Sequence, residues 1–133
     1  MRFQLTYVGI QVRDLDRSIA FYRDLLGMRL LRRSRVPETG GEWAELASPG
    51  SPQILELNWY PEGSEFFAGP YRSGDELDHI AFEVEDVAQA YQQLIDRGAQ
   101  PGHPPFLEGD TMLAFAQDPD GIWIELTAPA AAK

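Results

Sequence analysis

The chain has 133 residues, of which 44% are hydrophobic, and a formal net charge of −10. This length suits one domain with a sizeable core, and the acidic charge argues against nucleic acid as a partner. No apolar run approaches the ~20 residues that span a bilayer. The absence of cysteine excludes a disulfide scaffold and a thiolate metal site. We therefore expect a cytoplasmic protein whose partner is a small molecule.

The first half of the chain predicts a strand, a helix and then three strands. Apolar residues alternate over 5–12, which indicates a strand. Large apolar side chains then recur at helical spacing from Leu15, and Gly27 ends that helix. Turns rich in glycine, proline and serine separate three further strands, predicted at 28–36, 43–47 and 53–59.

The second half predicts the same order of elements. A strand at 77–84 runs into Asp86, a good helix N-cap, and Gly98 ends the helix that follows. A short strand near Ala99 leads into a predicted loop from Pro101 to Asp110. Two strands connected by a tight turn complete this half, at 111–117 and 122–127, and 129–133 is expected to be a frayed tail.

The two halves predict two βαβββ modules, at about 3–60 and 77–128, within a single domain, 1–133. The connector 61–76 is rich in glycine, proline and serine but also carries Phe66, Phe67 and Tyr71. These aromatic residues either pack locally or line a ligand pocket. Each half has too little helix to cover both faces of its sheet, so one face must meet something else.

His79 lies on the strand that begins the second half. Side chains on a strand alternate between faces, so Ile80 and Phe82 share one face and His79 the other. The apolar face suits packing under a helix, which leaves the imidazole on the opposite face. The matching residue of the first half is Tyr7.

Two glutamates also occupy matched positions of the repeat. Glu56 and Glu125 each lie in the middle of an apolar strand, on the face opposite the apolar side chains. Burying a lone carboxylate costs several kcal/mol unless it is paired or binds a cation. Either these glutamates share a divalent metal with His79, or His79 is an ordinary sheet histidine and the glutamates pair with arginine. The remaining histidine, His103, lies in the predicted loop and is expected to be exposed rather than a ligand.

Four stretches together resemble the vicinal oxygen chelate superfamily of glyoxalases, bleomycin-resistance proteins and dioxygenases: Val8 to Tyr22, Leu26-Gly27-Met28, Asp78 to Phe82, and Asp118-Pro119-Asp120-Gly121 with Ile124-Glu125-Leu126. The resemblance extends over about 5–127 and is strongest to proteins similar to glyoxalase I. It implies an α+β fold of paired βαβββ modules, with an eight-stranded curved mixed sheet around a metal or ligand cavity. It also implies a homodimer.

The resemblance further implies a metal site. Carried over by motif, the ligands are Glu56, His79 and Glu125, and the first ligand position falls on Tyr7, where the family has His or Gln. The ion would be Ni, Zn, Co, Mn or Fe. Glyoxalase I carries an arginine for glutathione where this chain has Gln11, so glutathione and other thiols both remain candidate cosubstrates. Further substrate-binding candidates are Asn58 and Trp123.

The implied reaction is a proton transfer on a small substrate with neighbouring oxygens, such as a hemithioacetal of methylglyoxal, with Glu125 or Glu56 as the base. A ring-cleaving dioxygenase needs two histidines and one carboxylate, which the matched positions do not supply. An epimerase of the methylmalonyl-CoA type is disfavoured by Glu56. The main alternative is a bleomycin-type antibiotic-binding protein of the same fold, which would lack the metal and the activity.

Overall fold

The computed structural model describes all residues except 3, 65–70, 73, 75–76 and 131–133. The chain divides into two compact units, Met1–Arg72 and Ser73–Lys133, which we call the first and second module. Phe66 and Phe67, and the end of the predicted tail, lie outside the described residues. No helix in the described part of the chain has the length and apolar character to cross a membrane.

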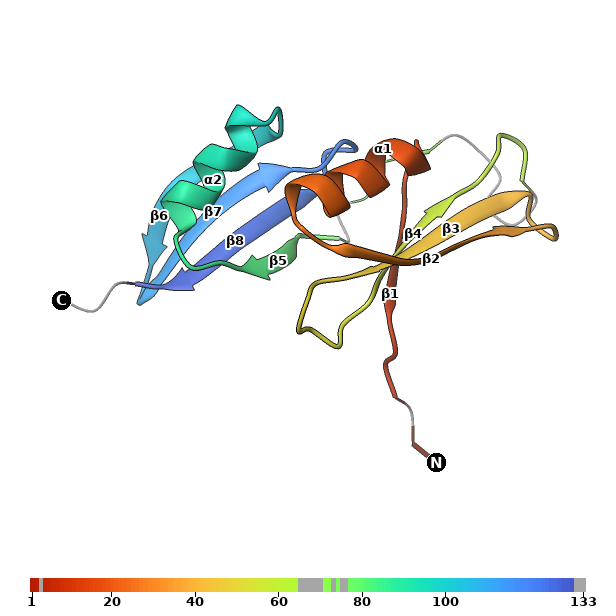
Figure 1. Ribbon diagram of the computed structural model, residues 1–133, viewed down its shortest axis with the longest axis horizontal. Helices are drawn as coiled ribbons and strands as arrows, with labels where there is room; N and C mark the ends of the chain where they lie inside the picture. Colours follow the sequence, from red (N-terminus) through yellow and green to blue (C-terminus); the bar gives the residue numbers. More distant parts are fainter. Residues whose placement is uncertain (3, 65–70, 73, 75–76, 131–133) are drawn as a thin grey trace. The chain divides into compact units, whose positions relative to one another are not determined.

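The first module contains a short strand, a helix and three further strands (Figure 1). The helix begins after Asp14, whose Oδ1 accepts a hydrogen bond from the Arg17 amide at 3.0 Å. It continues as a π-helical turn and stops at Gly27, which has a φ of 71°. The elements are β1 (Val8–Gln11), α1 (Leu15–Ala20), η1 (Phe21–Leu25), β2 (Arg29–Val36), β3 (Gly41–Ala47) and β4 (Leu55–Trp59).

The second module repeats this order. Asp86 caps the helix by accepting a hydrogen bond from the Gln89 amide at 3.0 Å, and Gly98 follows the helix with a φ of 97°. The elements are β5 (Ile80–Glu83), α2 (Val87–Asp96), β6 (Gln100–Glu108), β7 (Thr111–Gln117) and β8 (Trp123–Pro129).

The two modules share one sheet topology. In the first the strand order is β1-β4-β3-β2, and in the second it is β5-β8-β7-β6. The first strand of each module pairs in parallel with the last, and the other pairs are antiparallel. The α+β class and the paired βαβββ modules are therefore confirmed. The eight strands implied by the resemblance are present as two four-stranded mixed sheets, one in each module.

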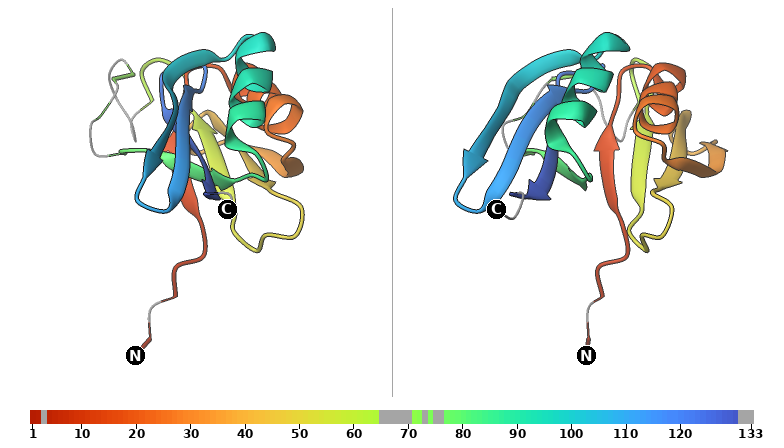
Figure 2. Two further views of the ribbon diagram at one scale, coloured as in Figure 1. Left: turned by 90° about the vertical axis from the view of Figure 1, so that its left-hand side faces the viewer. Right: turned by 60° about the vertical axis from the view of Figure 1, so that its left-hand side comes forward.

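Each helix covers one face of its own sheet (Figures 1 and 2). In the first module the buried strand residues include Ala44, Leu46 and Leu57, all fully inaccessible to solvent. In the second module Ile124 and Leu126 are buried in the same way. The face that lies away from the helix therefore carries the alternate residues, among them Glu56 and Glu125, as the alternation predicts.

One predicted loop is a strand. Residues 101–110 were expected to form a loop because they contain three prolines and two glycines, yet β6 extends from Gln100 to Glu108. β6 is the edge strand of its sheet, and its register shifts on either side of His103. Proline is tolerated at sheet edges and bulges because the missing amide donor is not needed there. His103 is exposed, as predicted, but lies on a strand.

The first strand of each module is shorter than predicted. β1 begins at Val8 instead of Leu5, and β5 begins at Ile80 instead of Leu77. Tyr7 and His79 thus both lie immediately before the first strand of their module. Residues 4–7 extend away from the sheet (Figure 1), and Leu5 is exposed.

Candidate functional site

His79 and Glu125 meet on the helix-free face of the second module. The distance from His79 Nε2 to Glu125 Oε2 is 3.0 Å. The contact follows from the register, because Ala81 pairs with Glu125 in the parallel ladder and His79 lies two residues before Ala81. The imidazole side chain is 35% exposed and the carboxylate 15% exposed, so this pair lies in a half-buried position. The two predicted ligands that belong to one module are therefore in contact.

Asp78 holds the other nitrogen of the same imidazole. Its Oδ1 lies 2.6 Å from His79 Nδ1. A carboxylate behind the second nitrogen of a histidine is typical of metal sites, because it fixes the orientation of the ring and increases the basicity of the ligand. Asp78 was not among the predicted site residues, because alternation on the predicted strand 77–84 places neighbouring side chains on opposite faces. β5 begins only at Ile80, so Asp78 and His79 both lie before the strand.

A row of aromatic rings begins at His79. The ring of Phe115 packs edge-on against His79, with 5.8 Å between ring centroids, and lies 5.2 Å from Trp123. Phe106 stacks on the other side of Phe115, at 6.3 Å and an interplanar angle of 25°. Trp123 is 38% exposed, so part of this aromatic surface is open to a ligand. Trp123 therefore lies next to the ring that contacts His79, and its role in substrate binding stays a prediction.

Glu56 occupies the equivalent position in the first module. It pairs with Gly9 in the parallel ladder of β1 and β4, as Glu125 pairs with Ala81 in the second module. A Cβ atom at Gly9 would lie 3.0 Å from Asn58 Nδ2 and 3.8 Å from Glu56 Oε1. The absent side chain of Gly9 thus leaves room for these two polar groups to lie over β1.

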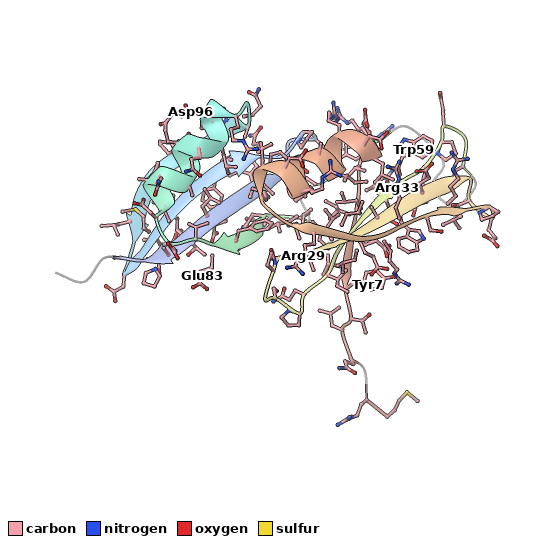
Figure 3. The ribbon with its side chains drawn as sticks, in the orientation of Figure 1. Tyr7, Arg29, Arg33, Trp59, Glu83 and Asp96 are labelled. Atoms are coloured by element: carbon pink, nitrogen blue, oxygen red, sulfur yellow. The ribbon has the colours of Figure 1, made fainter. Side chains whose placement is uncertain are left out.

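Tyr7 and His79 occupy equivalent positions in the two modules, because each lies one residue before the first strand of its module. Tyr7 is therefore the residue of the first module that corresponds to the histidine next to Glu125. The phenol is half exposed. Figure 3 shows Tyr7 on the side of the sheet away from α1. The repeat therefore puts a phenol at the position where the second module has an imidazole. A phenol is a poor metal ligand unless it is ionised.

The electrostatic effect of Glu56 extends to a neighbouring phenol. Burial raises the pKa of the Tyr60 phenol above its ordinary value, and the negative charge of Glu56 raises that pKa further. Tyr60 and Glu56 are four residues apart on or just after β4. Glu56 and Tyr60 are therefore close enough to interact electrostatically.

The two polar candidates for substrate binding are neighbours. Gln11 pairs with Asn58 between β1 and β4, two residues beyond the Gly9–Glu56 pair. Asn58 in turn pairs with Trp43 on β3. Both candidates therefore lie on the same face as Glu56, in the next row of residues.

Glu56 belongs to the first module, whereas His79 and Glu125 belong to the second. The structure thus shows a contacting pair in the second module and a carboxylate in the first. Among the described residues no group of three or more histidine, aspartate and glutamate side chains could hold a metal ion as it stands. The complete ligand set stays a prediction.

A second charged pair was missed by the sequence analysis. Arg32 Nη2 lies 2.6 Å from Glu45 Oε1, and the Arg32 guanidinium lies 5.5 Å from the centroid of the Trp43 ring. Alternation on β3 could have assigned Glu45 to the face of Glu56. The partner strand of β3, and hence Arg32, could not be read from the sequence.

The comparisons with known proteins agree with this fold. The sequence profile of the Glyoxalase/Bleomycin resistance protein/Dioxygenase superfamily matches residues 4–126. The chain is 37% identical to the "Probable lactoylglutathione lyase" of Synechocystis sp., over 97% of this chain and 98% of that protein. It is 36% identical to the lactoylglutathione lyase of Salmonella typhimurium, over 92% of this chain and 90% of that protein.

A solved structure shows the same likeness. The trypanothione-dependent glyoxalase I of Leishmania major superposes with a TM-score of 0.76 at 32% sequence identity, covering 94% of this chain and 86% of that one. Paired βαβββ modules and this likeness define the class of protein. The chain belongs to the glyoxalase/bleomycin resistance protein/dioxygenase superfamily.

Proposed function

We propose that the protein is a divalent-metal-dependent lyase of the glyoxalase I type. Its substrate would be the hemithioacetal that forms between methylglyoxal and a thiol, with glutathione as the first candidate because relatives at 36% and 37% identity are named lactoylglutathione lyases. The observation that carries the proposal is the contact of His79 with Glu125 on the helix-free face, with Asp78 behind the imidazole.

The residues present fit a divalent metal. An imidazole nitrogen and a carboxylate oxygen already lie 3.0 Å apart, and the second imidazole nitrogen has a carboxylate partner. In the proposal His79 and Glu125 supply two ligands and Glu56 a third, with Tyr7 at a fourth, weaker position. This donor set suits Ni, Zn, Co, Mn or Fe.

The bound metal would supply Lewis acidity for the negative charge that develops on the substrate oxygens. The chain itself would move the proton. Glu125 or Glu56 would take a proton from one substrate carbon and return it to the neighbouring carbon, as a general base and then a general acid. Asp78 would keep the His79 ring oriented, and Phe115 would shield it from water on one side.

The test is a coupled measurement of metal and turnover. Wild-type protein should carry divalent metal and convert the methylglyoxal–glutathione hemithioacetal to a thioester, followed by ultraviolet absorbance. A chelator should abolish turnover, and added metal should restore it. Replacing Glu125 by Gln should lower kcat by about a hundredfold or more, whereas Glu85→Gln, which removes a carboxylate outside the site, should not.

A protein that contains no metal and turns over no hemithioacetal would contradict the proposal and would favour the antibiotic-binding members of the superfamily. The homodimer and the cytoplasmic location remain predictions of the same proposal. The dimer can be checked by sedimentation of the purified protein.

A further inference from the structure

The helix-free face of the first module carries a row of charged residues. The strand registers align Arg32 on β2 with Glu45 on β3, Glu45 with Glu56 on β4, and Glu56 with Gly9 on β1. Residues paired across a ladder share a face. Arg32, Glu45 and Glu56 therefore lie side by side on the face of the proposed base, and we call them the charged row.

The second module places different residues in the equivalent row. There the registers align His103 with Phe115, Phe115 with Glu125, and Glu125 with Ala81. Phe115, which packs against His79, thus corresponds to Glu45. The neighbour of the glutamate is aromatic in the second module and charged in the first, so the two faces offer different surroundings to a ligand.

The charged row presents a cation to solvent. The Glu45 side chain is only 12% exposed, whereas the Arg32 side chain is 70% exposed. Glu45 lies directly across from Glu56, and two carboxylates in that relation repel each other. Arg32 offsets this repulsion by its 2.6 Å contact with Glu45.

Glu45 and Trp43 together fix the position of Arg32. The guanidinium contacts the carboxylate on one side and lies near the face of the indole ring, at 5.5 Å from its centroid. A guanidinium has more N–H donors than one contact to Glu45 uses, and its planar fork matches a carboxylate. Pre-positioning by two protein groups lowers the entropic cost of binding a further anion.

The neighbouring arginine is arranged differently. Arg33 Nη1 lies 2.6 Å from Asp16 Oδ1, and Arg33 Nη2 lies 2.9 Å from Glu42 Oε2. Asp16 belongs to α1, so Arg33 lies on the helix side of the sheet (Figure 3). Arg33 therefore serves as a matched control, because it is one residue away on the same strand, on the opposite face.

We propose that Arg32, positioned by Glu45 and Trp43, binds a carboxylate of the substrate. This inference rests on the proposed function, and it adds a specificity residue outside the predicted ligand set. β2 and β4 are two strand spacings apart, about 10 Å. A carboxylate several bonds from the reacting carbons spans that distance. It can come from the aldehyde half of the hemithioacetal or from the thiol half.

The experiment compares substrates that differ in one carboxylate. In the aldehyde arm, 4,5-dioxopentanoate is compared with methylglyoxal, both with glutathione. In the thiol arm, glutathione is compared with its monoethyl ester, both with methylglyoxal. For each arm the ratio of kcat/KM for the more anionic to the less anionic substrate is measured in wild type, Arg32→Gln and Arg33→Gln.

Arg32→Gln should lower this ratio about tenfold or more in one arm, chiefly because KM for the more anionic substrate increases. The arm in which the ratio changes identifies which half of the hemithioacetal supplies the carboxylate. Arg33→Gln, which removes the same charge from the same strand, should leave both ratios at their wild-type values. A ratio that Arg32→Gln does not change in either arm overturns the inference. So does an equal change with Arg33→Gln, because it would indicate a long-range charge effect.

A binding measurement separates this inference from the proposed function. Wild type and Arg32→Gln are titrated calorimetrically with 4,5-dioxopentanoate and with S-hexylglutathione, whose thiol is blocked. Binding of either probe that weakens about tenfold or more in Arg32→Gln supports the role of Arg32, even if no hemithioacetal is turned over. Affinities that are equal in the two proteins overturn it, even if the enzyme is active.

Discussion

The contact between Asp78 and His79 provides a sharp prediction about metal affinity. Asp78→Asn retains the shape of the side chain and removes the charge that faces His79 Nδ1 at 2.6 Å. Carboxylates behind ligand histidines typically change metal affinity by 10- to 100-fold. Asp78 is 91% exposed, and water screens its charge. We therefore expect Asp78→Asn to weaken metal binding by about tenfold, the lower end of this range. This corresponds to about 1.4 kcal/mol of metal-binding free energy.

The assay is a competition titration in which a chromophoric chelator and the protein share a limiting amount of Zn²⁺ or Ni²⁺. Glu85→Gln is the matched control. It removes one negative charge from an exposed residue just after β5, at the opposite end of that strand from His79. Equal affinities for wild type and Asp78→Asn would refute the role assigned to Asp78. Equal losses in the two variants would attribute the effect to net charge instead of to orientation of the imidazole.

Three further predictions follow from single contacts. Gly102→Ala would bring a Cβ atom within 2.9 Å of the Phe115 carbonyl oxygen, so it should destabilise the protein by about 1–3 kcal/mol. Thermal unfolding measures this loss, and an unchanged melting temperature would contradict the close packing of β6 against β7. Tyr7→His should increase metal affinity about tenfold or more in the competition titration, because an imidazole replaces a phenol at the first ligand position; unchanged or lower affinity would exclude that position. Glu56→Gln should lower the pKa of Tyr60 only part of the way toward its ordinary value, because burial is the larger cause of the increase and the charge of Glu56 the smaller. Spectrophotometric titration, with Tyr60→Phe as the reference, measures this pKa. An unchanged titration would contradict the proximity of Glu56 and Tyr60.

The repeat was the most informative feature of the sequence. Period-two alternation assigned His79 and Glu125 each to the face opposite the apolar side chains of its strand, and the structure places them 3.0 Å apart. The same alternation placed Glu56 opposite the buried Leu57. These predictions succeeded because alternation depends only on local strand geometry, which the sequence carries directly.

The errors have identifiable physical causes. β6 was predicted to be a loop because its prolines cannot complete a ladder, but an edge strand needs only one side of its backbone for pairing. The contact of Arg32 with Glu45 depends on which strands are neighbours and on their register, and alternation within one strand contains neither. The contact of Asp78 with His79 was not predicted, because alternation assigns neighbouring residues of a strand to opposite faces, whereas both residues lie before the start of β5.

The central claim is that residues from both halves of the repeat hold one divalent metal. The most direct measurement is the metal content of the purified protein by mass spectrometry, for wild type, Glu56→Gln, His79→Ala and Glu125→Gln, with Glu83→Gln as a control on β5. The account predicts stoichiometric divalent metal in wild type and in Glu83→Gln, and a large loss in each of the other three variants. Metal that persists in Glu56→Gln while it is lost from His79→Ala would contradict a site shared by the two modules.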